Sequence, residues 1–391
     1  MVTNPAFKKR HLVVPVFIPS MLFSSGEGAI LPILPTTAQH LGANLPTAGL
    51  IAGLTMVGTV AFDVPAAKLV HRFGERRAML GSSFVAAFAL IAAMLAPNLW
   101  LLGAAVLVAG AMISTFALAR HAFMAEHVPV THRARSLSLL GGMFRAGAFI
   151  GPAVAAAVVF TVGTTWVFVA GALLCLAAGI VLLASPRDAV PDGSGGHHGS
   201  TLAVARMEWR KLATVGMAAT IVASLRTVRQ IGLPLWGIFI GMHPGTVSLY
   251  IGVAGFLDFL LFYASGQIMD RFGRRWVLLP TLIGLALAHY ALVFAHDANG
   301  FLVVALLMSL ANSLGSGIVL TLGADLAPAN ARGEFLAAYR LLVDAGVAVT
   351  PLLLSGMTVA ITLPGAVIVF ATVSLVGAGL GWRGLRRFNI R

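Results

Sequence analysis

Charge and cysteine are both scarce in this chain. Only 10% of its 391 residues are charged, and Cys175 is the single cysteine. One thiol cannot form an intramolecular disulfide or a cysteine metal cluster, so neither a disulfide framework nor a metal site is expected. The sequence has no run of the form Gly-x-x-x-x-Gly-Lys-Ser/Thr, which argues against ATP as an energy source. It also lacks a clustered nucleophile, base and oxyanion donors, so we expect neither an enzyme nor a cofactor.

Apolar sequence takes the place of the missing charge. Hydrophobic residues make up 59% of the chain and the mean hydropathy is +0.93, which is typical of a protein that lives in a lipid bilayer. Twelve apolar segments can each supply about 20 helical residues, enough to cross a hydrocarbon core of ~30 Å. Irregular backbone is not tolerated against lipid, so these segments must be helices. The expected spans are 12–36, 46–70, 78–97, 99–125, 136–160, 164–185, 212–237, 246–269, 276–296, 299–324, 334–358 and 363–384.

The net charge of +13 would suggest a nucleic-acid partner in a soluble protein. Here most of the basic residues fall in predicted loops on one side of the membrane, from Lys8, Lys9 and Arg10 to Arg386 and Arg387. This positive-inside bias predicts that both termini are cytoplasmic, in a multi-pass protein of the inner membrane with no nucleic-acid partner. The first apolar run continues to about Gln39, too long for a signal-peptide core, so it is interpreted as an uncleaved first span.

The chain repeats itself. When the second half is aligned with the first at a constant sequence separation, Ala67 aligns with Gly266. The other aligned positions are Pro35 with Pro234, Gly42 with Gly241, Pro129 with Pro328, Arg133 with Arg332 and Pro152 with Pro351. An offset that holds over such a length indicates a tandem duplication. We therefore expect a six-helix bundle at 1–185, a cytoplasmic linker at 186–211 and a second six-helix bundle at 212–391. In parallel repeats of this kind the substrate site lies between the halves near the middle of the membrane.

Three motifs carry a resemblance to a known family. They are the loop motif Gly266, Asp270, Arg271, Gly273, Arg274 and Arg275, with a weaker copy that keeps Arg72 and Gly74; the span-five motif Gly147, Gly151 and Pro152; and the first-span run from Glu27 to Pro35. The chain resembles the major facilitator superfamily, and among its members the twelve-span drug:proton antiporters. The resemblance implies an all-α membrane protein of 12 transmembrane helices in two pseudo-symmetric bundles. It also implies a monomer that binds a small-molecule substrate within the lipid bilayer, with the proton as the coupling ion.

Apart from Lys68, Glu334 and Arg383 at span ends, nine charged side chains fall inside the predicted spans. Each costs about 2.5–3.5 kcal/mol at the bilayer centre unless it has a partner or a purpose. They are Glu27, Asp63, Asp258 and Asp344, and Arg120, Arg145, Arg226, Arg229 and Arg340. At 1.5 Å per residue, Arg145 and Asp258 both lie ~18 Å from the loop arginines. Because the resembled family packs span five on span eight and span two on span eleven, two ion pairs between the halves are expected: Arg145–Asp258 and Asp63–Arg340. Such pairs are either static staples or contacts that break and form during transport.

Roles follow as hypotheses. Glu27, in the middle of the first span, is the first choice for a proton carrier and is also a candidate for substrate binding. Asp63, Asp258 and Asp344 are further proton-coupling candidates. Arg226, Arg229 and Gln230 share one helical face and could bind an anionic headgroup of the substrate; alternatively, Glu27 and Asp344 only neutralise these arginines. The predicted function is proton-coupled export of a small amphipathic or drug-like molecule by alternating access. Uptake of a metabolite or metal, lipid flipping and a non-transporting sensor remain alternatives.

Overall fold

The computed structural model describes residues 13–128, 130–184 and 201–388, and this part of the chain forms helices without any strand. The basic residues at 8–10 and most of the expected linker, 186–200, lie outside it. The elements of the first half are η2 (Val13–Phe17), α1 (Ile18–Ile30), α2 (Leu34–His40), α3 (Leu45–Phe73), α4 (Glu75–Met94), α5 (Leu99–His127), α6 (Val130–Thr161) and α7 (Trp166–Leu183). The first span is thus bent after Ile30, where Pro32 and Pro35 lack the N–H groups that a continuous helix needs.

Helical structure resumes at Thr201, inside the expected linker 186–211. The elements from there on are α8 (Thr201–Met207), α9 (Trp209–Lys211), η3 (Leu212–Gly216), α10 (Met217–Phe239), α11 (Pro244–Phe272), α12 (Arg275–Leu292), α13 (Ala298–Leu314), α14 (Ile318–Leu326), η4 (Ala329–Ala331) and α15 (Arg332–Arg387). The described residues contain 11 helices long and apolar enough to cross a membrane. One of them, α15, has 56 residues and would be about 84 Å long if straight. Its backbone turns back at Thr362, two residues before Pro364, so it supplies both the eleventh and the twelfth predicted crossing.

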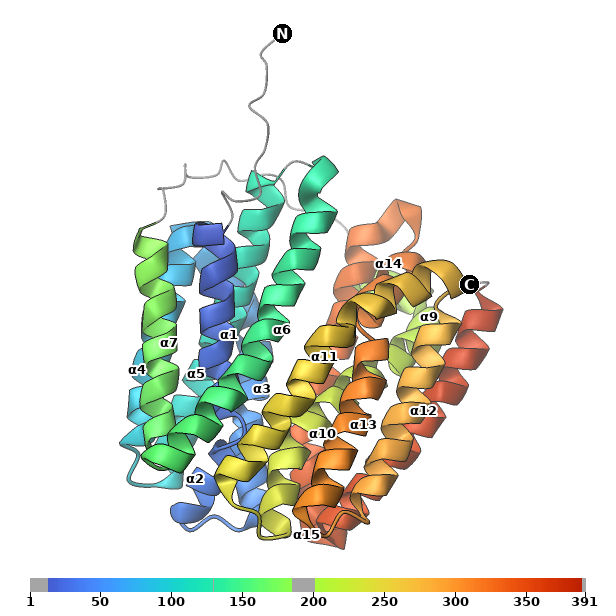
Figure 1. Cartoon of the computed structure of the whole chain (residues 1–391). Helices are drawn as coiled ribbons and strands as arrows, with labels where there is room; N and C mark the ends of the chain where they lie inside the picture. The colour runs from blue at the N-terminus through green and yellow to red at the C-terminus, as the bar shows by residue number, and fades with distance from the viewer. Residues whose placement is uncertain (1–12, 129, 185–200, 389–391) are drawn as a thin grey trace.

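Two bundles stand side by side, one built from α1 to α7 and the other from α9 to α15 (Figure 1). They meet along two seams, α6 against α11 and α3 against the first part of α15. In the first seam the ring of Phe149 lies 5.3 Å from those of Phe256 and Phe259. These are the span five–eight and span two–eleven contacts that the duplication and the resemblance predicted. The expected all-α fold with paired bundles is confirmed.

The seams are tight at one face of the molecule and looser at the other. We call the face on which η2 begins and α15 ends the terminal face, and the other the closed face (Figure 1). At the closed face Ser355 of α15 donates a hydrogen bond to the carbonyl of Pro46 at 2.8 Å. There, too, Phe160 at the end of α6 stacks on His243, with 5.5 Å between the rings. Toward the terminal face the ribbons of α6 and α11 diverge (Figure 1).

Closure depends on a close approach of α3 to α15 at Gly53. A Cβ atom on Gly53 would collide with the ring of Pro351 across the seam. We therefore expect Gly53→Val to wedge the closed face open and to abolish transport while the protein still inserts in the membrane. With Cys175 replaced by alanine, a cysteine at position 355 should then react faster with a membrane-impermeant maleimide added on that face.

The matched control for this wedge is Gly81→Val, because a Cβ at Gly81 of α4 meets no atom within 4 Å. It should change neither transport nor labelling. Equal labelling of Ser355→Cys with and without Gly53→Val would contradict the assignment of this seam as the closed gate.

Candidate functional site

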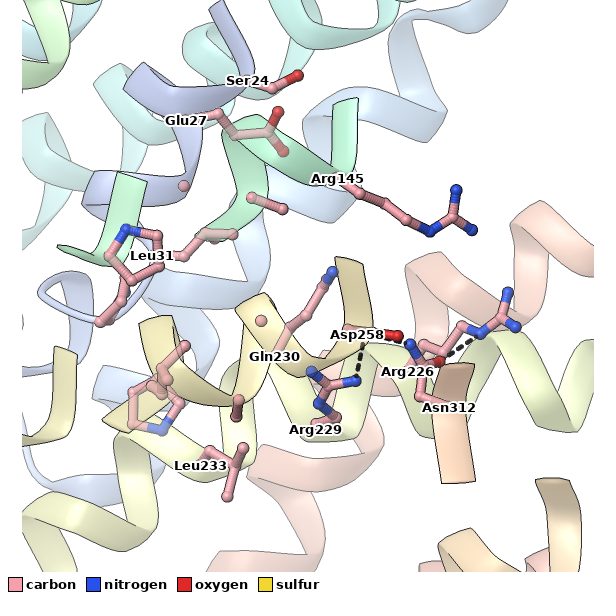
Figure 2. Close-up of a pocket in the computed structure, with 18 of the residues that line it drawn as sticks. Ser24, Glu27, Leu31, Arg145, Arg226, Arg229, Gln230, Leu233, Asp258 and Asn312 are labelled. Carbon is pink, nitrogen blue, oxygen red and sulfur yellow. Dashed lines mark hydrogen bonds and ion pairs between the residues drawn. The ribbon is translucent and has the colours of Figure 1, made fainter. Parts of the chain in front are cut away.

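A cavity of about 180 Å³ lies between the two halves. Its lining comes from α1 and α6 in the first half and from α10, α11 and α13 in the second, with Leu31 and Pro32 of the α1–α2 bend. The charged and polar side chains that line it are Ser24, Glu27, Arg145, Arg226, Arg229, Gln230, Asp258 and Asn312 (Figure 2). The expected site residues near mid-membrane therefore come together around one space, with Asp63, Arg340 and Asp344 elsewhere.

Glu27 lines the first-half side of the cavity. It belongs to α1, which packs against α6. These helices touch closely because Gly147 and Gly151 have no side chains: a Cβ on Gly147 would lie 2.5 Å from Cβ of Ser24. A Cβ on Gly151 would lie 2.5 Å from the backbone of Ser25 and Ala29. The span-five motif thus fixes the helix that carries Glu27.

Arg120 of α5 is the cation that acts most strongly on Glu27. Its side chain is buried, its guanidinium lies 5.0 Å from the ring centroid of Phe144, and its Nε has no hydrogen-bond partner. From its place close to the cytoplasmic end of the fourth predicted span, Arg120 would be expected to anchor a loop or Glu126. In the structure it is buried against Phe144, where its charge acts on Glu27 without a direct ion pair between these two described residues.

The second-half wall holds a buried ion pair that differs from the predicted one. Arg229 of α10 contacts Asp258 of α11 at 3.1 Å, and the same Asp258 oxygen accepts a hydrogen bond from Asn312 at 2.6 Å. Arg229 also donates to Ser309 at 2.9 Å. The expected Arg145–Asp258 pair is therefore wrong in this conformation. The depths predicted for Arg145 and Asp258 agree with their positions, since both line one cavity. However, Arg229 lies in the same bundle as Asp258 and forms the ion pair with it.

Arg145 is directed elsewhere. Its guanidinium donates to the Ser316 hydroxyl at 3.1 Å and to the Gly141 carbonyl at 3.3 Å, and lies 4.9 Å from the ring centroid of Phe262. It still bridges the halves, because Ser316 and Phe262 belong to the second half. The bridge is made through a neutral hydroxyl and an aromatic face, not through a carboxylate.

Arg226 stabilises a break in the tenth span. The helix stops at Leu314 and resumes at Ile318, with the intervening Gly317 at φ 80°. Arg226 donates to the carbonyl of Gly315 at 2.7 Å and to the side chain of Asn312 at 2.9 Å. Broken helices occur at membrane depth only where other groups satisfy the freed backbone atoms. Of the four residues predicted to bind substrate, Glu27 lines the first-half wall, and Arg226 and Arg229 are engaged within their own bundle. Gln230 is exposed in the cavity (Figure 2).

A second cluster lies outside the cavity, on the α3–α15 seam. Arg340 contacts Asp63 at 3.4 Å and Asp344 at 3.2 Å, and Asp63 also accepts a hydrogen bond from Ser114. The expected Asp63–Arg340 contact is thus present. The Arg340 side chain is 64% exposed, whereas those of Arg229 and Asp258 are about 14–15% exposed.

This difference in exposure predicts a small effect on stability. A half-exposed pair is worth about 0–1 kcal/mol. We therefore expect Asp63→Ala to lower the free energy of unfolding by no more than about 1 kcal/mol, as measured by denaturant titration of the protein in nanodiscs. Asp63→Asn serves as the isosteric control, and a loss several times larger would show that the seam depends on this pair.

The loop motif lies at the terminal face. Gly273 and Gly74 end α11 and α3 in left-handed backbone conformations, at φ 94° and 81°. Arg274 pairs with Asp325 of α14 at 2.7 Å and so ties the loop to the tenth span. The remaining motif residues do not line the cavity. Arg72 and Arg271 lie over the rings of Phe73 and Phe272. Asp270 is exposed, Arg275 begins α12, and a Cβ atom on Gly266 would meet no described neighbour.

Sequence reasoning missed Asn312, Ser309 and Ser316, which hold the charged groups of the second half. A signal for them was present. The segment from Ser309 to Gly317 breaks an otherwise apolar span with polar residues and glycines, and such interruptions mark binding regions in transporters.

Comparison with known proteins agrees with this architecture. The family model described as Major Facilitator Superfamily matches residues 16–242 and again 214–390. The chain is 24% identical over 311 residues to an MFS-type transporter of Mycobacterium tuberculosis, covering 72% of this chain and 45% of the relative. It therefore spans less than half the length of that relative. It is also 26% identical over 308 residues to the class C tetracycline resistance protein of Escherichia coli, covering 74% and 75% of the two chains.

Solved structures show the same fold. A POT family transporter in complex with a thioalcohol-conjugated peptide superposes with a TM-score of 0.80 at 13% identity, covering 97% of this chain and 96% of the other. An inward-facing, unoccupied bacterial homologue of the human lysosomal transporter Spinster gives a TM-score of 0.77 at 13% identity, covering 99% and 98%. The two segments matched by the family model overlap at 214–242, correspond to the two halves of the duplication and together cover nearly the whole chain. The chain belongs to the Major Facilitator Superfamily, whose members are transporters and not enzymes.

Proposed function

We propose that this protein exports a small amphipathic molecule in exchange for protons, by alternating access of the cavity between its halves. The observation that carries the proposal is the position of Glu27, a carboxylate in the wall of a cavity between two bundles that are closed at one face. The similarity to tetracycline resistance proteins supports export. The bias of basic residues toward one side supports a cytoplasmic terminal face, which makes this conformation the inward-facing one in an inner-membrane monomer.

Coupling between proton and substrate movement depends on two opposing influences on the protonation of Glu27. A low-dielectric environment favours the neutral form of a carboxylic acid, whereas a nearby guanidinium favours the charged form. Arg120 supplies that guanidinium from α5. Movement of α1 relative to α5 as the cavity changes sides would therefore shift Glu27 between a protonated and a charged state. Proton uptake from one side and release to the other would then accompany substrate movement in the reverse direction.

The test is flux into proteoliposomes with an imposed pH gradient, using tetracycline as the first probe. An antiporter moves its substrate into the more acidic compartment whichever way the protein is inserted, and a symporter moves it into the more alkaline one. We expect accumulation in an acidic lumen that collapses with nigericin and is absent in protein-free liposomes. Accumulation in an alkaline lumen would favour proton-coupled uptake instead.

The probe set also includes 1-naphthoate, 1-naphthamide and 1-naphthylmethylammonium, which share one apolar body and differ in charge. Movement of every probe at the same rate with and without the gradient would defeat the antiport proposal.

A further inference from the structure

The charged groups around the cavity do not balance. Three guanidinium groups line it, from Arg145, Arg226 and Arg229, against the two carboxylates of Glu27 and Asp258. Arg120, behind Glu27, adds a fourth buried cation. The centre of the bundle therefore carries more positive than negative charge, and the excess grows when Glu27 is protonated. Uncompensated charge inside a membrane protein is costly, so such an excess points to a missing anion.

The partners of each cation show where the excess lies. Arg229 pairs with Asp258 at 3.1 Å, whereas Arg120, which Glu27 influences electrostatically, does not line the cavity. Arg226 donates to Gly315, the C-terminal cap of α13, where unpaired carbonyls carry partial negative charge. Arg226 and Arg229 are thus held by groups of the protein itself.

Arg145 is different. Like those of Arg226, its hydrogen-bond acceptors within the described part of the chain are neutral, but they are more distant, the Gly141 carbonyl at 3.3 Å and the Ser316 hydroxyl at 3.1 Å. Neither of these two acceptors belongs to the C-terminal cap of a helix. The nearest acid, Asp258, acts on Arg145 electrostatically but is engaged by Arg229 and Asn312. In Figure 2 the Arg145 side chain extends away from Glu27, and no dashed line joins it to another of the side chains drawn. Its fork of donors can still bind a carboxylate, sulfonate or phosphate in a bidentate manner.

We infer that the substrate is an organic anion whose acidic group binds Arg145. The inference rests on the proposed function, because it takes this cavity as the substrate site. The exposed amide of Gln230 lines the same cavity and offers a further hydrogen-bond donor. The apolar body of the substrate would lie against Leu31, Leu233 and Ile251, which line the rest of the cavity. The cargo is thus an amphipathic monoanion, such as an aryl or alkyl carboxylate.

The test is equilibrium binding to the purified full-length protein in nanodiscs, followed as the shift in unfolding temperature with ligand concentration. The probes are 1-naphthoate, 1-naphthamide and 1-naphthylmethylammonium. We expect wild type to bind the anion about tenfold or more tightly than the amide, and the cation least. Arg145→Gln should remove the preference for the anion, and Arg145→Lys should keep part of it.

Arg386→Gln is the matched control, because Arg386 lies on the terminal face against Trp382, away from the cavity. It should bind like wild type. Equal or tighter binding of the amide or the cation, failure of all three probes to bind, or an anion preference that survives Arg145→Gln would each overturn the inference.

Binding needs no gradient, so the two proposals fail separately. A protein that binds the anion through Arg145 but shows no pH-driven flux would defeat the antiport and leave this inference standing. A protein that uses the pH gradient to move the amide or the cation, but not the anion, would support the antiport and defeat this inference.

Discussion

Truncating Asp258 to alanine is expected to destabilise the protein by about 3–5 kcal/mol, the usual cost of leaving one member of a buried ion pair unpaired. Asp258 accepts from both Arg229 and Asn312, and the Arg229 side chain is only 14% exposed. With the carboxylate gone, the guanidinium keeps Ser309 as its remaining side-chain partner in the described bundle. The measurement is the free energy of unfolding in nanodiscs, together with transport, which should be abolished.

The control for this prediction removes the charge along with its partner. Replacing a buried pair by apolar residues of similar volume is often neutral or stabilising. The double variant Arg229→Leu/Asp258→Leu should therefore recover most of the stability that Asp258→Ala loses. If Arg145→Leu rescues Asp258→Ala instead, the dominant partner of Asp258 would be the one across the seam, contrary to the contacts seen here.

Most of the fold could be predicted from the sequence because lipid imposes so few choices. A span must be a helix of a certain length, and the duplication relates one half to the other. Depth along a helix follows from counting residues, which is why Glu27, Arg145 and Asp258 were all expected near mid-membrane. The Thr362 turn, too, falls between two predicted spans.

The partner of each arginine could not be predicted in the same way. Counting residues gives height but not rotation about the helix axis, and an arginine side chain is long enough to choose among several neighbours. Asp258 lies level with Arg145, yet Arg229 reaches it within one bundle. Arg120 was misplaced because its helix packs it inward against Phe144, and no pattern in an apolar run shows that direction. The site was therefore predictable as a set of residues, but not as a set of bonds.

The hydrogen bonds and ion pairs around the cavity suggest different roles for the two halves. In the second half Arg226, Arg229, Asp258 and Asn312 form a network that fixes α10, α11 and the broken tenth span as one unit. In the first half no hydrogen bond or ion pair between described residues joins Glu27 of α1 to Arg120 of α5, so no such polar network ties these two side chains together. Proton coupling is therefore better placed on the first-half wall, and Asp258 is reassigned from a proton carrier to a structural partner within the proposed mechanism.

This division makes Glu27→Gln the variant with the largest expected effect on coupling. Glutamine keeps the size and hydrogen-bonding capacity of the side chain but cannot gain or lose a proton at any ordinary pH. We expect pH-driven accumulation to fall to the level of protein-free liposomes, because the carrier can no longer exchange a proton between the two faces. Substrate counterflow without a gradient should persist, since the cavity and its second-half network are untouched.

Two comparisons make the result decisive. Glu27→Asp retains a titratable group at the same place and should keep part of the pH-driven accumulation, whereas Asp344→Asn removes an acid that lies outside the cavity on the α3–α15 seam. If Asp344→Asn abolishes the response to the gradient and Glu27→Gln does not, the proton pathway runs through the Asp63–Arg340–Asp344 cluster. The coupling step would then be the breaking of a contact between the halves, and Glu27 would serve only to balance the charge of Arg120.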